Sequence, residues 1–174
     1  ASNGSIGAIA VAPSDPNVIY VGTGAGIIRP DLATGDGMYK STDAGKTWIH
    51  LGLFDSQMIA QIEIDAKNPD RIFVAVLGHP YGPNTERGVF RSIDGGKSFQ
   101  NVLYKDEYTS ANDVRIDPND PNVVYAALWE QQQSFIEGGG LGGTGDGKGN
   151  VIYKSTDGGT TRKRLTAGLP ASIE

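Results

Sequence analysis

The stretch Ser41-Thr-Asp43-Ala-Gly45-Lys-Thr47-Trp48 decides how this chain folds. The same pattern returns as Ser92-Ile-Asp94-Gly-Gly96-Lys-Ser98-Phe99 and as Ser155-Thr-Asp157-Gly-Gly159-Thr-Thr161-Arg162. Each copy follows an alternating apolar run and precedes another, which is typical of the turn of a β-hairpin. In such a turn the Asp and Ser side chains bond to nearby backbone N–H groups, and glycine adopts a positive φ that other residues reach only at a cost. The repeated motif therefore predicts a structural turn and not a ligand site.

Two further landmarks give the length of the repeat. The proline of the first turn recurs after 53 and 52 positions, at Pro16, Pro69 and Pro121, and the turn aspartates recur after 51 and 63 positions. The longer interval comes from the loop at 129–150. A period of about fifty residues with four strands is what a β-propeller blade requires. We therefore expect an all-β fold, a β-propeller section of about three four-stranded blades at 5–52, 58–104 and 111–166, which together form one partial domain over 1–174.

The composition narrows the choice of fold and partner. The chain has 174 residues, a formal net charge of −5, 25 glycines, 9 prolines and no cysteine. Many short β-rich runs end in Gly, Asp, Asn or Pro, which favours an all-β fold with almost no helix. The 15 basic residues are scattered, so we expect no nucleic-acid partner. No apolar run reaches membrane-spanning length, so we expect no membrane span.

The motif also resembles that of a known group of proteins. Ser-x-Asp-x-Gly-x-Thr-Trp is the Asp-box, or BNR repeat, and Asp15-Pro-Asn-Val-Ile-Tyr-Val-Gly22 and Glu86-Arg-Gly-Val-Phe-Arg-Ser92 are similar to strings in sortilin-type (VPS10-like) and glycosyl-hydrolase-like bacterial propellers. The resemblance spans nearly the whole chain and implies the propeller fold. It implies no single function, because Asp-boxes occur in sialidases, xyloglucanases, sortilins and non-catalytic propellers. The structural positions that it assigns are Ser41, Asp43, Gly45, Trp48, Ser92, Asp94, Gly96, Phe99, Ser155, Asp157 and Gly159.

Two copies of the motif depart from this pattern at its last position. Phe99 replaces the tryptophan in the second copy, and Arg162 replaces it in the third. Because Arg162 removes an apolar contact, we expect the last hairpin to pack differently from the other two.

Three blades do not close a propeller, and an unclosed section leaves an apolar face exposed at each end. We therefore expect a section of a larger propeller of about six to eight blades, or a chain that closes by self-association. Its partners are then further propeller blades from the same polypeptide or a second copy. The first residues, Ala1-Ser-Asn-Gly4, show neither the charged nor the apolar region of an export signal, so we expect that the chain lacks one or starts after it. The resemblance implies an extracellular or periplasmic bacterial protein.

The order of strands sorts the loops between the two ends of a blade. The Asp-boxes and the Asp-Pro-Asn turns share one end, while the loops 23–36, 77–87 and 129–150 share the other with 52–58 and 104–110. Binding residues tend to lie on variable loops held by a rigid scaffold. The candidate ligand-binding residues at this end are Arg29, His79, Tyr81, Arg87, Asp106, Glu107, Tyr108, Trp129, Glu130 and Phe135, and the same loops carry Asp31, Asp36, Glu86, Gln131 and Glu137.

Structural roles compete with binding roles at several of these positions. Aromatic residues are largely buried in proteins, which favours packing at a loop base for Trp129 and Tyr81. His79 precedes a proline and has no obvious ligand partner, so it is expected to order its loop and not to bind a metal. The adjacent Glu86 and Arg87 are expected to form a local ion pair that braces the loop.

Two functions fit this set of residues. Aromatic side chains beside carboxylates and amides suit a sugar or an extended peptide, which favours a secreted or periplasmic scaffold that binds a protein or glycan through its long-loop face. The alternative is a part of a glycoside hydrolase, which needs two carboxylates about 5–9 Å apart. Asp106, Glu107, Glu130 and Glu137 are its candidates. A sialidase would need several arginines, and this end offers chiefly Arg29 and Arg87.

No cofactor is expected, and calcium is the one metal that stays open. The glycines at 22–26 lack the spacing and the following helix of a dinucleotide site. Asp146-Gly-Lys-Gly-Asn150 followed by Asp157 imitates an EF-hand loop, but Lys148 and Val151 stand where a ligand and a glycine belong. Eight of the twelve residues at 138–149 are glycine, which predicts a mobile loop and no phosphate site.

Overall fold

The computed structural model describes residues 4–27, 32–130 and 150–169, and these contain strands and no helix. The first four strands are β1 (Ile6–Ala12), β2 (Asp15–Thr23), β3 (Met38–Ser41) and β4 (Ile49–Gly52). The next four are β5 (Ile59–Asp65), β6 (Asn68–Val76), β7 (Gly88–Ser92) and β8 (Gln100–Leu103). The last four are β9 (Thr109–Ile116), β10 (Val124–Glu130), β11 (Val151–Ser155) and β12 (Lys163–Leu165).

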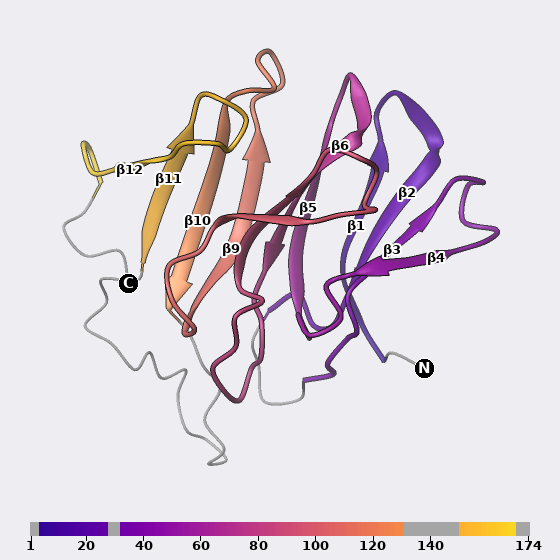
Figure 1. Cartoon of the computed structure of the whole chain (residues 1–174), viewed down its shortest axis with the longest axis horizontal. Coiled ribbons are helices and arrows are strands. Elements are labelled where there is room, and N and C mark those ends of the chain that lie inside the picture. Colours follow the sequence, from indigo (N-terminus) through magenta and orange to yellow (C-terminus); the bar gives the residue numbers. More distant parts are fainter. Residues whose placement is uncertain (1–3, 28–31, 131–149, 170–174) are drawn as a thin grey trace.

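The strands form three antiparallel four-stranded sheets in the described residues, each with its strands in sequence order. We call these sheets the first, second and third blades. The first strands of the blades are neighbours, since β1 contacts β5 and β5 contacts β9. The sheets stand side by side with the second blade in the middle (Figure 1). This arrangement confirms the expected propeller section of three blades.

The first turn of two blades differs from the sequence-based expectation in its boundaries. Ala12 pairs with Asp15, and Asp65 pairs with Asn68, so each turn tip has two residues, at 13–14 and 66–67. The Asp-Pro-Asn sequence of the first blade therefore opens the second strand and does not form the turn itself. Proline is tolerated there because it lies at the start of a strand.

The Asp-box turns share one hydrogen-bond network. In the first blade the Ser41 hydroxyl donates to Asp43 Oδ1 at 2.8 Å and accepts from the Gly45 N–H group at 2.8 Å. Asp43 in turn accepts from the N–H group and the hydroxyl of Thr47. The same bonds recur around Asp94 and Asp157. Both carboxylate oxygens of each aspartate accept hydrogen bonds within the turn, which is the structural role that the sequence predicts.

Each Asp-box is also bonded to a residue beside the first turn of its own blade, the one that follows Pro16, Pro69 or Pro121. The N–H groups of Ala44, Gly95 and Gly158 donate to the carbonyls of Asn17, Asp70 and Asn122 at 2.9–3.1 Å. The Asp-boxes and the first turns therefore lie at one end of the blades, and the longer connections lie at the opposite end (Figure 1). The predicted sorting is confirmed for the described residues, whereas 28–31 and 131–149 of the loops 23–36 and 129–150 lie outside them.

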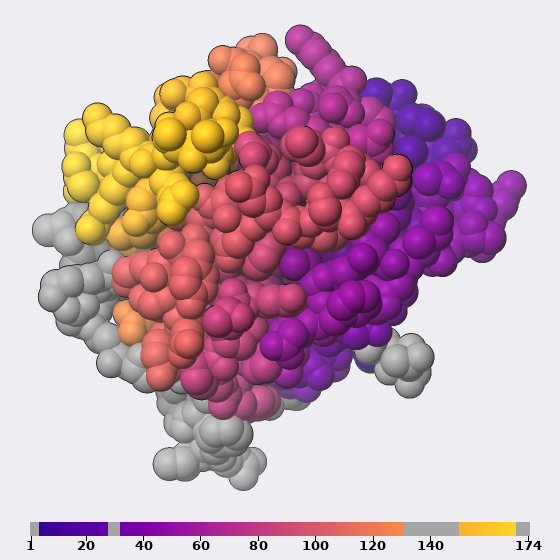
Figure 2. All heavy atoms as spheres, viewed as in Figure 1, coloured from indigo at the N-terminus to yellow at the C-terminus, as the bar shows by residue number. Residues whose placement is uncertain are grey.

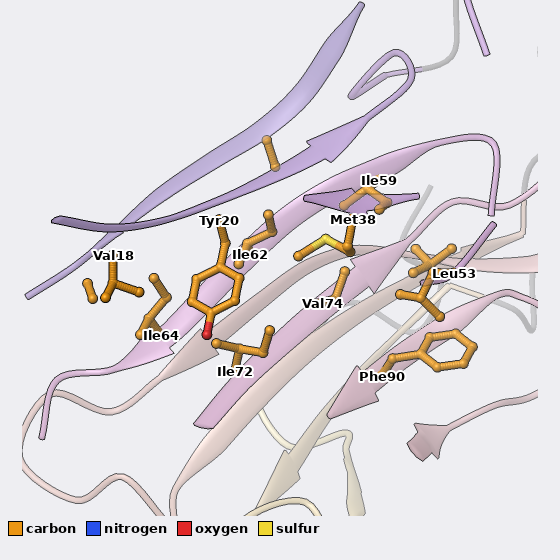
Figure 3. Close-up of a cluster of buried hydrophobic side chains, with 13 residues drawn as sticks. Val18, Tyr20, Met38, Leu53, Ile59, Ile62, Ile64, Ile72, Val74 and Phe90 are labelled. Carbon is orange, nitrogen blue, oxygen red and sulfur yellow. The ribbon is translucent and has the colours of Figure 1, made fainter. Parts of the chain in front are cut away.

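The core lies between the blades. Figure 3 shows the cluster where Tyr20 of β2 and Met38 of β3 meet Ile62 and Ile64 of β5 and Ile72 of β6. A second cluster joins the other face of the second blade to the third blade. Because apolar burial contributes about 25 cal/mol per Å², each blade is stabilised mainly by its neighbours.

The third Asp-box packs differently from the second, as expected from its arginine. Phe99 packs against the cluster between the first and second blades. Arg162 stands at the matching position of the third blade, is exposed, and donates from Nη1 to the Val102 carbonyl at 2.8 Å. A hollow lined by Phe73, Val102, Gly159 and Arg162 remains between the second and third blades.

Replacing Arg162 by tryptophan is expected to stabilise the protein by about 1 kcal/mol. Burying a large apolar side chain gains about 1.5–3 kcal/mol, and the lost hydrogen bond costs about 0.5–1.5 kcal/mol. Thermal unfolding followed by circular dichroism measures the change, and Lys163→Trp, a neighbouring exposed position, is the matched control. A lower melting temperature for Arg162→Trp than for the wild type would contradict the packing argument.

The Asp-boxes also predict a loss of stability in acid. Hydrogen bonds from the hydroxyl and N–H group of Thr47, and then from Ser41, lower the pKa of Asp43 to about 2, and the matching bonds lower the pKa of Asp157 to about 2. A free aspartate has a pKa of about 3.9. A carboxylate whose pKa is lowered by folding stabilises the native state above the unfolded pKa, and this contribution is lost as the pH falls through the folded pKa.

We therefore expect the free energy of unfolding to fall between about pH 4 and about pH 2. The fall is expected to be less steep in Asp43→Asn, because one of the contributing carboxylates is gone. Urea unfolding across this range measures it. Asp120→Asn, in a turn outside the Asp-boxes, should unfold with the wild-type slope, and an unchanged slope in Asp43→Asn would count against the prediction.

Candidate binding site at the loop end

Three loops meet at the end of the second blade opposite its Asp-box, and we call this region the loop end. The loops connect β4 to β5, β6 to β7 and β8 to β9. Asn84 joins all three: its N–H group donates to the Glu107 carbonyl at 3.3 Å, and its side-chain amide donates to the Asp55 carbonyl at 3.3 Å. Its Oδ1 accepts from the His79 N–H group at 2.9 Å. One buried residue, through its backbone and its side chain, thus fixes the relative positions of three surface loops.

Arg87 holds the β6–β7 loop from inside. Its side chain is fully buried, and its guanidinium donates to the carbonyls of Leu77, His79 and Gly82 and to the Ser110 hydroxyl. Burial lowers the pKa of Arg87 to about 10, which still leaves it protonated at neutral pH. Arg87 therefore serves the framework of the loop end and has no surface to offer to a ligand.

The prediction of a local ion pair between Glu86 and Arg87 is wrong, and both residues lie in the described part of the chain. The donors of Arg87 are directed at the carbonyls and the hydroxyl named above, while Glu86 Oε2 accepts from the Asp55 N–H group at 3.0 Å. The interpretation assumed that neighbouring opposite charges pair. At this point of the chain the two side chains bond to different partners.

Asp55, His79 and Glu86 form a small ionisable group at the surface of the loop end. His79 Nε2 lies 2.9 Å from Asp55 Oδ1. Burial raises the pKa of Glu86, and the nearby Asp55 charge adds to this, against the opposing effects of the Asp55 N–H bond and His79. The sequence suggested that His79 orders its own loop. Through Asp55 it also contacts the β4–β5 loop, so it orders two loops.

Asp106 caps the β8–β9 turn. Its Oδ1 accepts from the N–H groups of Tyr108 and Thr109 at 2.9 and 2.8 Å. Burial opposes ionisation of this carboxyl, but hydrogen bonds from Thr109 and Tyr108 outweigh it and lower the pKa of Asp106. A carboxyl of this kind stays ionised, so it suits a turn and cannot serve as a general acid near neutral pH.

Strand pairing brings Trp129 and Glu130 to the same end. Trp129 pairs with Ser110 and Glu130 pairs with Thr109, directly after the Asp106 turn. Trp129 is half-buried, which fits the expected packing at the base of a loop. Tyr81, for which packing was also expected, has 39% of its surface exposed.

Exposed aromatic side chains gather on the loop end. Its three loops carry Phe54, Tyr81, Tyr104 and Tyr108, whose exposed fractions are 64%, 39%, 37% and 36%. Exposed carboxylates of Asp55 and Glu107 lie on the same loops. Rings that offer apolar faces beside hydrogen-bonding groups can hold a sugar or an extended peptide.

The structure brings together many of the residues that the sequence selected. Eight of them lie on the loop end or on the strands that lead into it, namely His79, Tyr81, Glu86, Asp106, Glu107, Tyr108, Trp129 and Glu130. Asp36 does not, because it bonds to Tyr39 and Thr23 within the first blade. The candidates outside the described residues are Arg29, Asp31, Gln131, Phe135, Glu137 and the glycine-rich stretch with most of the EF-hand-like segment.

Sequence reasoning missed five residues of this region, namely Phe54, Asp55, Asn84, Tyr104 and Ser110. Asn84 follows Gly82-Pro83, a turn signal that could have pointed to it. Ser110 and Asp55 carry no such signal, since their roles arise from contacts with distant parts of the chain.

Metal sites and membrane helices are not seen in the part of the chain that the structure describes. No three His, Cys, Asp or Glu side chains gather there in a way that could hold a metal ion. Nor does that part contain a helix that is long and apolar enough to cross a membrane.

The fold and the repeated turns define the class of this protein as an Asp-box β-propeller section. Residues 36–170 match the family model Sortilin-Vps10, described as sortilin, neurotensin receptor 3. Because this match covers well over half of the chain, the chain belongs to the Sortilin-Vps10 family. No curated protein matches it.

Solved structures show the same fold. An ancestral GH74 enzyme is similar with a TM-score of 0.66 and 23% identity, over 94% of this chain and 18% of that one. The GH74 enzyme of Niastella koreensis gives 0.59 and 20%, over 90% and 20% of the two chains. YCF48 from Cyanidioschyzon merolae gives 0.55 and 18%, over 94% and 38%. The chain therefore spans about a fifth of the GH74 enzymes, and at these identities the likeness shows the propeller fold alone.

Loss of the Arg87 guanidinium is expected to destabilise the protein. Arg87→Met leaves the partly buried carbonyls of His79 and Gly82 without this donor, while the Leu77 carbonyl keeps the Ser110 hydroxyl. The loss costs about 2–4 kcal/mol. Denaturant unfolding measures the loss, and Arg164→Met, which changes an exposed arginine of β12, is the control. Equal stability of the two variants would show that Arg87 does not hold the loops.

Proposed function

We propose that this chain is part of a secreted or periplasmic propeller that binds a protein or glycan through its loop end. The observation that carries the proposal is the group of exposed aromatic side chains on loops that buried Asn84 and Arg87 hold in place. Preformed loops lower the entropy that a ligand must overcome on binding. Rigid aromatic side chains are the residues that most often dominate a binding surface.

The family name favours a peptide as the ligand. The matching model is described as sortilin, neurotensin receptor 3, which is the name of a receptor. An extended peptide could place apolar side chains on Tyr81 and Tyr108, and its basic groups beside Asp55 or Glu107. A glycan is the other ligand that stacked rings and carboxylates suit.

A glycoside hydrolase is the second candidate function, and Glu86 is the observation that favours it. The raised pKa of Glu86 is the property that a general acid needs, and Asp55 is its neighbour. Asp106, a candidate from the sequence, lacks that property. The aromatic side chains outnumber the carboxyls suited to catalysis, so binding remains the favoured function.

Removal of two exposed rings is expected to weaken binding. The double variant Tyr81→Ala, Tyr108→Ala should bind arrayed peptides and arrayed β-linked oligosaccharides roughly tenfold or more weakly than the wild type, as for other aromatic binding residues. Ile93→Ala, an exposed position in the Asp-box of the second blade, is the matched control. Binding to neither array, or equal loss in the control, would contradict the proposal, and release of reducing ends from a β-glucan would favour the hydrolase.

A further inference from the structure

Gly78 stands at the base of the β6–β7 loop, against the two residues that hold the loop end together. Its φ is +81°, in the left-handed region that side chains rarely adopt. A Cβ atom added to Gly78 would lie 2.4 Å from Asn84 Oδ1 and 2.5 Å from Arg87 Cγ. Real Cβ atoms essentially never show a contact under 3.0 Å. Asn84 and Arg87 therefore hold their positions because residue 78 has no side chain.

The bonds of these two residues enclose Gly78 from both sides. The Arg87 guanidinium donates to the carbonyls of Leu77 and His79, which flank Gly78 in the chain. Asn84 Oδ1 accepts from the N–H group of His79 at 2.9 Å, in the peptide unit that follows Gly78. Gly78, Asn84 and Arg87 are all buried, so an added methyl group has no solvent-filled space to enter. A methyl group at position 78 would therefore displace both side chains and break bonds on both sides of the residue.

The same two residues set where two exposed rings of the loop end lie. Arg87 Nη2 donates at 3.0 Å to the carbonyl of the residue that follows Tyr81. The Asn84 N–H group donates at 3.3 Å to the carbonyl of the residue that precedes Tyr108. The two loops that carry these tyrosines lie side by side at the surface (Figure 2). The positions of the two rings relative to each other thus depend on the space at Gly78.

Two other glycines lack the contacts that Gly78 makes. Gly82 lies in the same loop, and a Cβ atom added to it would meet nothing within 4 Å. Gly168, outside the loop end, has a φ of +77°, close to that of Gly78, and its Cβ position is equally open. Gly168 therefore shares the backbone conformation of Gly78 without the contacts, and Gly82 shares only the loop. These two positions separate the effect of the contacts from the effects of backbone strain and of a methyl group in the loop.

We propose that Gly78 is a positioning residue of the loop end: because it has no side chain, Asn84 and Arg87 hold Tyr81 and Tyr108 in one relative arrangement. A ligand that contacts both rings then meets a surface that is already ordered, which lowers the entropy cost of binding. The role in binding rests on the proposed function of the loop end. The arrangement of the rings does not, and it can be measured without a ligand.

Electron paramagnetic resonance of two spin labels tests the arrangement directly. The chain has no cysteine, so Tyr81→Cys and Tyr108→Cys in one chain take one nitroxide label each. Gly78→Ala should broaden or shift the distance distribution that the two labels give with Gly78 in place. Gly82→Ala should leave this distribution unchanged. An unchanged distribution in Gly78→Ala, or an equal change in Gly82→Ala, would overturn the proposal.

Binding to the arrayed peptides and β-linked oligosaccharides tests the consequence. Gly78→Ala, with both tyrosines intact, should bind roughly tenfold or more weakly than the wild type, because the ligand must then order the loops itself. Gly168→Ala carries the comparable backbone strain and should bind as the wild type does. Wild-type binding that Gly78→Ala retains would overturn the proposal for Gly78 and leave the proposed function standing. No wild-type binding to either array would instead contradict the proposed function, and the spin-label distances would then decide the role of Gly78.

A double variant covers the case in which Gly78→Ala does not fold, as judged by circular dichroism. Asn84→Gly removes the side chain that lies nearest to the added methyl group. In that background Gly78→Ala should fold and should give the same spin-label distances as Asn84→Gly alone, because two substitutions that act through one contact are not additive. A Gly78→Ala chain that stays unfolded with Asn84→Gly would show that Gly78 serves the fold itself, and would overturn the proposal.

Discussion

The second blade of this protein is apolar on both of its faces, and the rest of the structure depends on that constraint. It is clearest in β6, where successive residues point into different cores: Ile72, Val74 and Val76 belong to the cluster shared with the first blade, and Phe73 and Ala75 to the cluster shared with the third. All five are buried. A sheet of this kind is stable only between two neighbours, because apolar surface left in water forfeits the burial energy that would hold it. The propeller arrangement follows from this two-sided pattern.

The same constraint separates structural and binding roles between the two ends of the blades. At one end the Asp-box carboxylates are consumed by their own turns, and the turns are joined to neighbouring strands. At the other end the loops are longer than the strand pairing requires, so their side chains are free to differ from blade to blade. In the second blade these loops contain buried Arg87 and Asn84 together with exposed aromatic rings. Rigid support below and aromatic side chains above are the combination that a binding surface needs.

The sequence predicted the parts of the fold that depend on local chemistry. The three Asp-boxes, the four strands of each blade and the sorting of the loops follow from turn residues and alternation, which act within a few positions of the chain. It failed where a contact joins distant residues. Nothing near Arg87 indicates that its guanidinium is buried against Ser110, 23 positions away, and proximity in the sequence wrongly suggested Glu86 as its partner. The strand boundaries at Asp15 and Asn68 were misplaced because proline was taken to mark the turn.

Hydrogen bonds from Lys40 to the Gly95 carbonyl and from Arg91 to the Gly158 carbonyl join neighbouring blades and add a direction to the apolar packing. Alternating apolar faces alone would let two sheets stack in either order, since the hydrophobic effect has no orientation. The bonds from Lys40 and Arg91 to the Asp-box carbonyls of the next blade are made by one face and received by the other. Contacts between unlike faces close into a ring when the rotation from blade to blade divides a full turn, and they extend without limit when it does not. The contacts of β1 with β5 and of β5 with β9 keep the first strands of the three blades next to one another. In both blade contacts that the structure describes, the Asp-box is the feature that the second and third blades present to the blade before them.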